Sequence, residues 1–135
     1  MFVKVFVNSN HIYDMQFCRY DYVYIIDYEI YKTVIDTYIN DYLDLPSSVK
    51  NFLELVNISR EVLSKLSIGE KIQVKSYGSK YKKHYITIPS KYLGKEIVIL
   101  DENEYLKLVE KLIKTITGRT IKKYEEYKEK TRLKL

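Results

Sequence analysis

Lysines are concentrated in one stretch of the chain, where their amines could bind a polyanion. Residues 71–95 contain seven lysines and no acidic residue. An amine on a flexible loop can follow the phosphates of a nucleic acid and release the counterions that surround them. Tyrosines alternate with these lysines, and tyrosine rings can stack on bases or donate to phosphates. The predicted nucleic-acid-binding residues are Lys75, Tyr77, Lys80, Tyr81, Lys82, Lys83, His84 and Lys91.

The sequence leaves two interpretations of this segment open. In the first, the lysines contact nucleic acid. In the second, the tyrosines fill the core of a sheet and the lysines only solvate an exposed hairpin. Arginine, the side chain that most often reads guanine directly, is absent from residues 71–95. The expected recognition is therefore weak or driven by the shape of the ligand, with little reading of individual bases.

Charge is distributed unevenly between the two halves of the chain. Residues 1–66 contain six Lys or Arg and nine Asp or Glu, a net charge of −3. Residues 67–135 contain 17 Lys or Arg and nine Asp or Glu, a net charge of +8. A chain that separates charge in this way often uses one part for a polyanion and another part for a different task.

The N-terminal half is rich in tyrosine, with eight of them between Tyr13 and Tyr42. These side chains can fill a core, where their hydroxyls need hydrogen-bond partners. They can also form a partner-binding surface, because tyrosine is enriched at protein interfaces. The main alternative function is therefore a protein-interaction module, such as a virus-encoded inhibitor of a host complex. Its predicted partner-binding residues share one face of a strand and are Tyr20, Tyr22, Tyr24 and Tyr28.

Patterns that could support catalysis or metal binding are weak. His11 and Asp14 could form an acid–base pair near Cys18, but no nucleophile elbow, phosphate-binding glycine loop or HExxH motif accompanies them. No Cys/His spacing matches a zinc site. The N-terminal carboxylates are too scattered for a metal cluster; they are Asp14, Asp21, Asp27, Glu29, Asp36, Asp41 and Asp44. The sequence predicts that the protein is not an enzyme and uses no metal or cofactor.

Composition narrows the class of protein further. The chain has no run of about 18 apolar residues, so no membrane partner is expected. Its single cysteine, Cys18, cannot form an internal disulfide, which favours the cytoplasm, or the host-cell cytoplasm if the protein is viral. The chain has 15 tyrosines but no alanine or tryptophan, which is typical of AT-rich coding sequence. Abundant Lys and Glu are compatible with a thermophilic source, archaeal or viral.

Hydrophobic periodicity predicts the elements of the N-terminal half. Residues 2–7 alternate as a strand, and residues 20–28 form a second strand rich in Tyr, Val and Ile. These two strands could pair as a hairpin. From about Glu29 the apolar residues recur at three- and four-residue steps, which indicates an amphipathic helix that Pro46 ends. Residues 49–55 then form a short helix, although this stretch could also lead into a strand.

The C-terminal half alternates short helices with strands. Ser59 suits the N-cap of a short helix. Asp101 caps a long helix, which Gly118 is expected to break, and residues 120–135 form a charged tail, helical or frayed. The remaining predicted elements are strands at 71–75, 83–88 and 96–100, a turn at 77–79 and a single helical turn at 89–93.

One segment resembles the AbrB/MazE-like swapped-hairpin DNA-binding family. It contains Lys75-Ser76-Tyr77-Gly78-Ser79-Lys80 and continues through Thr87-Ile88-Pro89-Ser90-Lys91-Tyr92-Leu93-Gly94-Lys95 into a strand. The resemblance is closest to archaeal and transposon-associated members and covers about a fifth of the chain. It implies that two chains interleave their hairpins into one small β-barrel and that basic loop residues contact DNA.

An imperfect second copy of this unit precedes the first. Ile58 aligns with Ile88 and Leu63 with Leu93, and after a gap the segment 69–74 aligns with 94–99. Two such units in one chain could form the barrel that other members assemble from two chains. The first unit lacks the basic hairpin and the proline, so only the second is expected to bind DNA strongly.

The predicted fold class is α+β, with a small β-barrel-like swapped-hairpin unit, an N-terminal strand and helix part and a C-terminal helix. Residues 1–48 are expected to dimerise the protein or bind a partner, residues 49–101 to form the AbrB-like unit, and residues 102–135 to form a helix and tail. We expect a homodimer that contacts duplex DNA through a lysine-rich β-hairpin, as a transcriptional regulator or antitoxin-like factor. An RNA-binding or ribosome-associated factor is a further alternative.

Overall fold

Strands form where apolar and polar residues alternate, and helices form where apolar residues recur every three or four positions. The computed structural model describes residues 1–133. Its strands are β1 (Phe2–Phe6), β2 (His11–Tyr13), β3 (Tyr22–Asp27), β4 (Glu70–Gln73), β5 (Lys75–Tyr77), β6 (Lys83–Thr87) and β7 (Glu96–Leu100). Its helices are α1 (Tyr28–Thr37), α2 (Ser47–Leu55), α3 (Arg60–Lys65) and α4 (Glu102–Leu133), with shorter helical turns η1 (Met15–Arg19), η2 (Tyr38–Tyr42) and η3 (Ser90–Tyr92).

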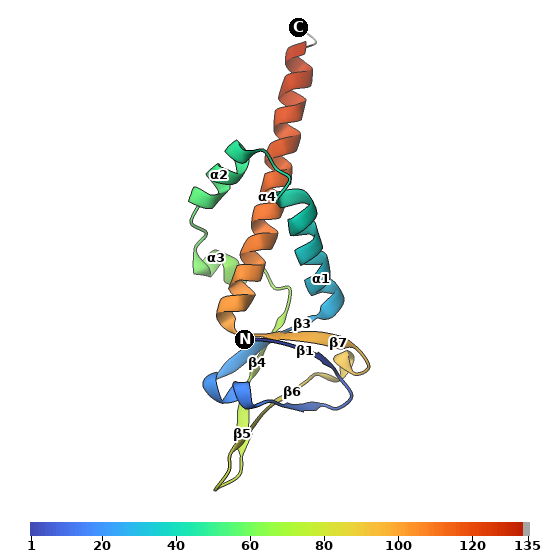
Figure 1. Ribbon diagram of the computed structural model, residues 1–135, viewed down its shortest axis with the longest axis vertical. Helices are drawn as coiled ribbons and strands as arrows, with labels where there is room; N and C mark the ends of the chain where they lie inside the picture. Colours follow the sequence, from blue (N-terminus) through green and yellow to red (C-terminus); the bar gives the residue numbers. More distant parts are fainter. Residues whose placement is uncertain (134–135) are drawn as a thin grey trace.

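The strands form two antiparallel sheets at one end of the molecule (Figure 1). Sheet A has the order β1-β7-β3-β4, and sheet B has the order β2-β6-β5. The chain crosses from sheet A to sheet B at Val74, whose N–H donates to the Asp21 carbonyl at 2.9 Å. Within residues 1–133 both sheets remain open, and they do not close into a barrel. The α+β fold class is confirmed.

An apolar core fills the space between the two sheets. Ile97 and Ile99 of β7 face this core from sheet A, and Ile86 of β6 faces it from sheet B. Phe17 of η1 is fully buried in the same cluster, so η1 closes one side of it. The buried members are Val7, Phe17, Val23, Ile25, Ile86, Ile88, Ile97 and Ile99.

Helices cover the opposite face of sheet A (Figure 1). Val98 of β7 belongs to a second apolar cluster, with Val109 of α4 and Leu63 of α3. Tyr24 of β3 stacks on Tyr105 of α4, with their ring centroids 4.0 Å apart. Sheet A is therefore covered on both faces, whereas the outer face of sheet B has no helix over it in Figure 1.

Helix α4 is the longest element. Its N-terminus is capped by Asp101, whose Oδ1 accepts a hydrogen bond from the Glu104 N–H at 2.9 Å. Its 32 residues span about 48 Å at 1.5 Å per residue. The buried cluster of Tyr42, Leu45, Val49 and Leu53 packs on it as far as Ile121, and the helix then extends beyond the rest of the molecule (Figure 1). No helix in residues 1–133 is both long and apolar enough to span a membrane.

The prediction that Gly118 breaks this helix is wrong. Helix α4 continues through Gly118 to Leu133. A Cβ atom at position 118 would lie only 2.4 Å from Cδ1 of the buried Leu45. Glycine therefore permits the close approach of the segment between η2 and α2, and packing along the helix offsets its low helix propensity.

The predicted strands are confirmed in position, but the predicted hairpin between the first two is wrong. β7 lies between β1 and β3 and pairs with both of them. The strand predicted at 71–75 is divided between sheet A and sheet B at Val74. Strands from residues 1–48 and from residues 49–101 thus share both sheets, so the expected segments are interleaved in space.

The two units of the expected repeat occupy related places in sheet A. β4 and β7 both pair with β3, and each follows a short helical turn and a glycine, Gly69 or Gly94. Their surroundings differ, because Leu63 of the first unit is buried among the helices, whereas its aligned residue Leu93 in the second unit is 43% exposed. The repeat itself stays a prediction.

Candidate nucleic-acid interface

The β5–β6 hairpin projects from the end of the molecule opposite the C-terminus of α4 (Figure 1). Tyr77 pairs with Lys83 beside the turn, and Gly78 opens the turn with a φ of +101°. A Cβ atom at Gly78 would lie 2.7 Å from the Tyr81 carbonyl oxygen. Glycine is therefore required there both for its conformation and for space. All residues of the tip, 78–82, are exposed.

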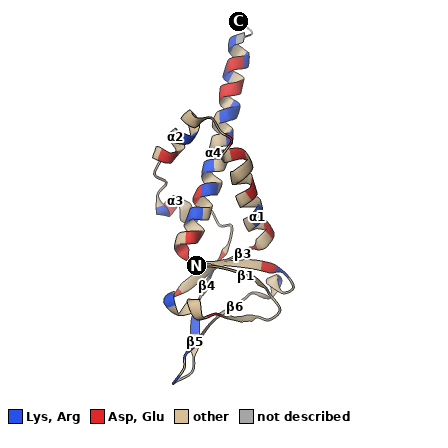
Figure 2. Ribbon diagram, viewed as in Figure 1, with Lys and Arg blue, Asp and Glu red and all other residues tan. Residues whose placement is uncertain are grey.

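The lysines of this hairpin differ from most other lysines that lie close to the sheets. The amine of Lys4 on sheet A lies 3.2 Å from the Glu96 carboxylate. The amine of Lys95, which follows η3, lies 3.9 Å from the Asp27 carboxylate. Figure 2 shows no acidic residue along the hairpin. Four exposed lysines there form no ion pair with any carboxylate in residues 1–133, and we call them the hairpin lysines: Lys75, Lys80, Lys82 and Lys83.

Three tyrosines from three different strands meet on the outer face of sheet B. Tyr13 of β2 and Tyr85 of β6 are directly opposite in the sheet, with ring centroids 5.4 Å apart. The ring of Tyr77 of β5 lies 6.0 Å from each of the other two. His11 adds a fourth ring, 5.3 Å from Tyr85. We call this set, His11, Tyr13, Tyr77 and Tyr85, the tyrosine face.

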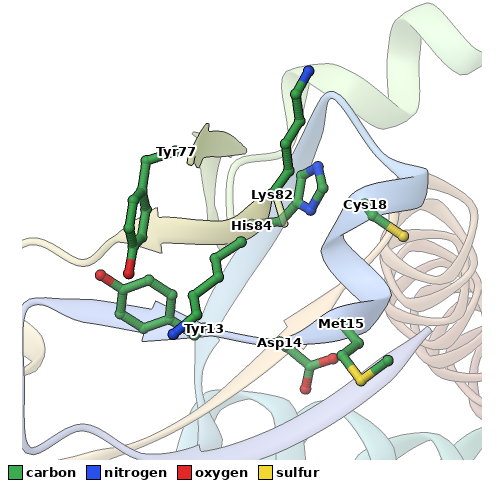
Figure 3. A pocket seen from close by; sticks show the side chains of 8 residues that line it. Tyr13, Asp14, Met15, Cys18, Tyr77, Lys82 and His84 are labelled. Carbon is green, nitrogen blue, oxygen red and sulfur yellow. The ribbon is translucent and has the colours of Figure 1, made fainter. Parts of the chain in front are cut away.

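A hollow of about 680 Å³ lies beside the tyrosine face, between η1 and the hairpin. It forms because the chain leaves sheet B after Tyr13, where the Asp14 N–H makes a last hydrogen bond to the His84 carbonyl at 3.4 Å. Figure 3 shows the Tyr13 and Tyr77 rings on one side of the hollow, with their hydroxyl groups next to each other. The lining residues are Tyr13, Asp14, Met15, Cys18, Tyr77, Lys82, Lys83 and His84.

The polar groups of the hollow suit an anionic ligand that also carries a ring. The pKa of Tyr13 is raised mainly by partial burial and, to a smaller extent, by the neighbouring Tyr77 and Tyr85 hydroxyls. The Tyr13 hydroxyl therefore remains a neutral hydrogen-bond donor. Asp14 is the one acidic residue of the lining. Its Oδ1 caps η1 by accepting a hydrogen bond from the Gln16 N–H at 2.8 Å.

The structure brings together seven of the eight residues predicted to bind nucleic acid, all on β5, the turn and the start of β6. The eighth, Lys91, lies on η3, where its amine contacts the Glu70 carboxylate and lies 5.2 Å from the centre of the Tyr92 ring. Its positive charge is thus already matched within the chain.

The tyrosines predicted to bind a partner make several contacts within the chain. The Tyr22 hydroxyl donates to Glu102, and the ring of Tyr24 stacks on Tyr105. The amine of Lys4 lies 3.9 Å from the centre of the Tyr28 ring, and Tyr20 packs against the core between the sheets. The prediction that the four share one face of a strand is wrong, because Tyr20 precedes β3 and Tyr28 begins α1. All four side chains are partly buried, and partner binding through them stays a prediction.

Sequence reasoning did not assign His11 and Tyr13 to this interface. They lie more than 60 positions before the hairpin and reach it only because β2 pairs with β6. The alternation of His11-Ile12-Tyr13 was the available signal, since it puts the two rings on one face of a short strand and Ile12 on the other.

No three His, Cys, Asp or Glu side chains gather as possible metal ligands in the described part of the chain. Searches against protein-family models, curated proteins and solved structures found no match. The resemblance to the swapped-hairpin family therefore stays a prediction.

Proposed function

We propose that this protein binds nucleic acid through the β5–β6 hairpin, with the hairpin lysines contacting the phosphate backbone. The observation that carries the proposal is the group of four exposed lysines without carboxylate partners among residues 1–133, on an element that projects from the molecule (Figure 2). Such lysines keep their full charge available for phosphates, and each phosphate contact adds affinity without sequence information.

Duplex DNA is the first ligand to test. The major groove of B-form DNA admits a two-stranded β-ribbon, which is the form of the projecting hairpin. The helices lie on the other side of sheet A and do not surround the hairpin (Figure 1). Because the hairpin contains no arginine, contacts to phosphates would dominate over contacts to bases.

The swapped-hairpin resemblance adds a proposal about assembly. Sheet B is open, with β2 and β5 as its edge strands. A second chain that paired along such an edge would extend the sheet towards the barrel that the resemblance implies. We propose a homodimer on this basis, and the molar mass measured by light scattering tests it.

The proposed function is tested by reversing the charge of the hairpin tip. The variant K80E/K82E/K83E should lose binding to a labelled DNA duplex in an anisotropy titration, because each substitution replaces an attractive contact with a repulsive one. Binding that equals that of the wild-type protein would refute the proposal.

A charge-matched control separates the hairpin from a general effect of net charge. The variant K122E/K123E/K130E changes the net charge by the same amount, but its three exposed lysines lie on the C-terminal half of α4, away from the hairpin (Figure 1). We expect this control to bind the duplex far more tightly than the hairpin variant. Equal loss in both variants would show that attraction is not localised to the hairpin.

A further inference from the structure

The tyrosine face is an aromatic surface that no other element of residues 1–133 covers (Figure 1). Tyr13 and Tyr77 are each 50% exposed, and His11 is also exposed. On the other face of the sheet, Ile86 of β6 is fully buried and Ile12 of β2 is partly buried, whereas Ser76 of β5 is exposed. Sheet B thus packs one face against the core and presents aromatic rings to solvent on the other face.

The geometry of these rings leaves them free to stack on a ligand. The planes of Tyr13 and Tyr77 are inclined by 76°, and those of Tyr77 and Tyr85 by 69°. In the core, by contrast, Tyr24 and Tyr105 lie parallel within 3° and stack on each other. The planes of Tyr13 and Tyr85 are inclined by 37°, so none of these three pairs is stacked in parallel, and the rings are not closed off face to face as in the core.

Each of two rings has a lysine directly across the sheet. Lys75 of β5 is opposite Tyr85 of β6, and Lys83 of β6 is opposite Tyr77 of β5. Side chains at opposed positions point to the same face with their Cβ atoms about 5 Å apart. An aromatic ring beside an amine matches the repeating unit of a single strand, in which each base is attached to a phosphate.

On these observations we propose that the tyrosine face stacks unpaired bases, so that the protein binds single-stranded nucleic acid more tightly than a duplex. The inference rests on the proposed function, because the hairpin lysines supply the phosphate contacts in both cases. Paired bases in a duplex are stacked on their neighbours and cannot offer their faces to Tyr13, Tyr77 or Tyr85. The hollow beside Tyr13 and Tyr77 gives an unstacked base room to enter.

The test compares single strands with a duplex in a tyrosine variant. Oligothymidylate and oligouridylate of about 12 nucleotides, within the usual site size, are measured separately so that DNA and RNA are distinguished. The variant Y13T/Y77T keeps β-branched residues in the strands but removes the two rings. We expect it to bind whichever single strand the wild-type protein prefers at least about tenfold more weakly, with duplex affinity changed less than twofold.

Two further variants keep the test decisive. Y13F/Y77F retains the rings and should lose far less single-strand affinity than Y13T/Y77T, which distinguishes stacking from hydrogen bonding by the hydroxyls. Y124T/Y127T removes two exposed tyrosines from the projecting part of α4 and should change neither affinity. Circular dichroism spectra of all variants establish that the sheets remain folded.

The outcomes separate the inference from the proposed function. If Y13T/Y77T binds single strands as the wild-type protein does, or loses duplex affinity equally, the stacking inference is overturned while nucleic-acid binding stands. If the wild-type protein binds neither single strands nor duplex, both are overturned. A 2-aminopurine base placed in the oligothymidylate gives a direct readout, because stacking on a ring quenches its fluorescence.

Discussion

The salt dependence of DNA binding is the sharpest quantitative consequence of the hairpin. Each lysine that neutralises a duplex phosphate contributes about −0.9 to the slope of log affinity against log salt concentration. Four hairpin lysines therefore predict a slope of about −3.6, and raising salt from about 50 to about 200 mM should weaken binding about 150-fold. The slope counts contacts, so it tests the geometry more directly than affinity at one salt concentration.

Replacing Lys80, Lys82 and Lys83 with alanine removes three of these contacts and leaves Lys75. The slope should fall to about −0.9, and the same change in salt should weaken binding only three- to fourfold, or about 0.5 log units. Alanine is preferred to glutamate here because it removes a contact without adding repulsion. The measurement is a set of anisotropy titrations with a labelled duplex at several salt concentrations.

The matched control is K122A/K123A/K130A, which removes the same charge from the C-terminal half of α4. Its slope should differ from that of the wild-type protein by no more than about 0.9, the contribution of one contact. A hairpin variant whose slope equals that of the wild-type protein would refute the reasoning, since phosphates would then be bound elsewhere. If the slope became shallower in the control and not in the hairpin variant, the phosphate contacts would be assigned to α4.

Three other predictions concern single residues. D14N removes the one carboxylate that lines the hollow while keeping a residue able to cap η1, so it should tighten DNA binding about two- to fivefold at low salt in the same titration. G69A should lower the free energy of unfolding by about 1–3 kcal/mol in urea, because its Cβ would lie 2.7 Å from a backbone oxygen of β3. Hydrogen bonds from the Tyr42 hydroxyl and, second, from the Lys114 amine lower the pKa of Glu54 below its ordinary value of 4.5. The ionised carboxylate therefore stabilises the fold above pH 4.5, and this stabilisation is lost as the pH falls below that value. In E54Q the free energy of unfolding should therefore change less between about pH 6 and about pH 3 than in the wild-type protein, and an equal change would contradict this assignment.

Local signals in the sequence identified most elements of the fold. Ser59 caps α3 by accepting a hydrogen bond from the Val62 N–H at 3.3 Å, as its position predicted. Asp101 caps α4 in the same way, and Gly78 opens the predicted turn. These features depend on residues within four positions of one another, so the sequence contains the information that forms them.

Features that depend on distant contacts could not be obtained in this way. The pairing of β7 between β1 and β3 joins residues 70 to 98 positions apart, and no periodicity specifies which strands become neighbours. Gly118 has the sequence signature of a helix end, but its contact with Leu45 makes it an interior position of a continuous helix.

At the interface, the positive charge follows from the residue types alone. The run of lysines without acidic residues and the Gly-Ser turn specify an exposed basic hairpin whatever the rest of the chain does. The aromatic rings beside the hairpin depend on long-range contacts, because pairing of β2 with β6 brings Tyr13 beside Tyr77 and Tyr85. The fold determines this arrangement. It also decided which lysines are free, since Lys91 meets Glu70 only when η3 folds towards β4. Charge is a property of composition, but the availability of a charge depends on which side chains the fold places within reach.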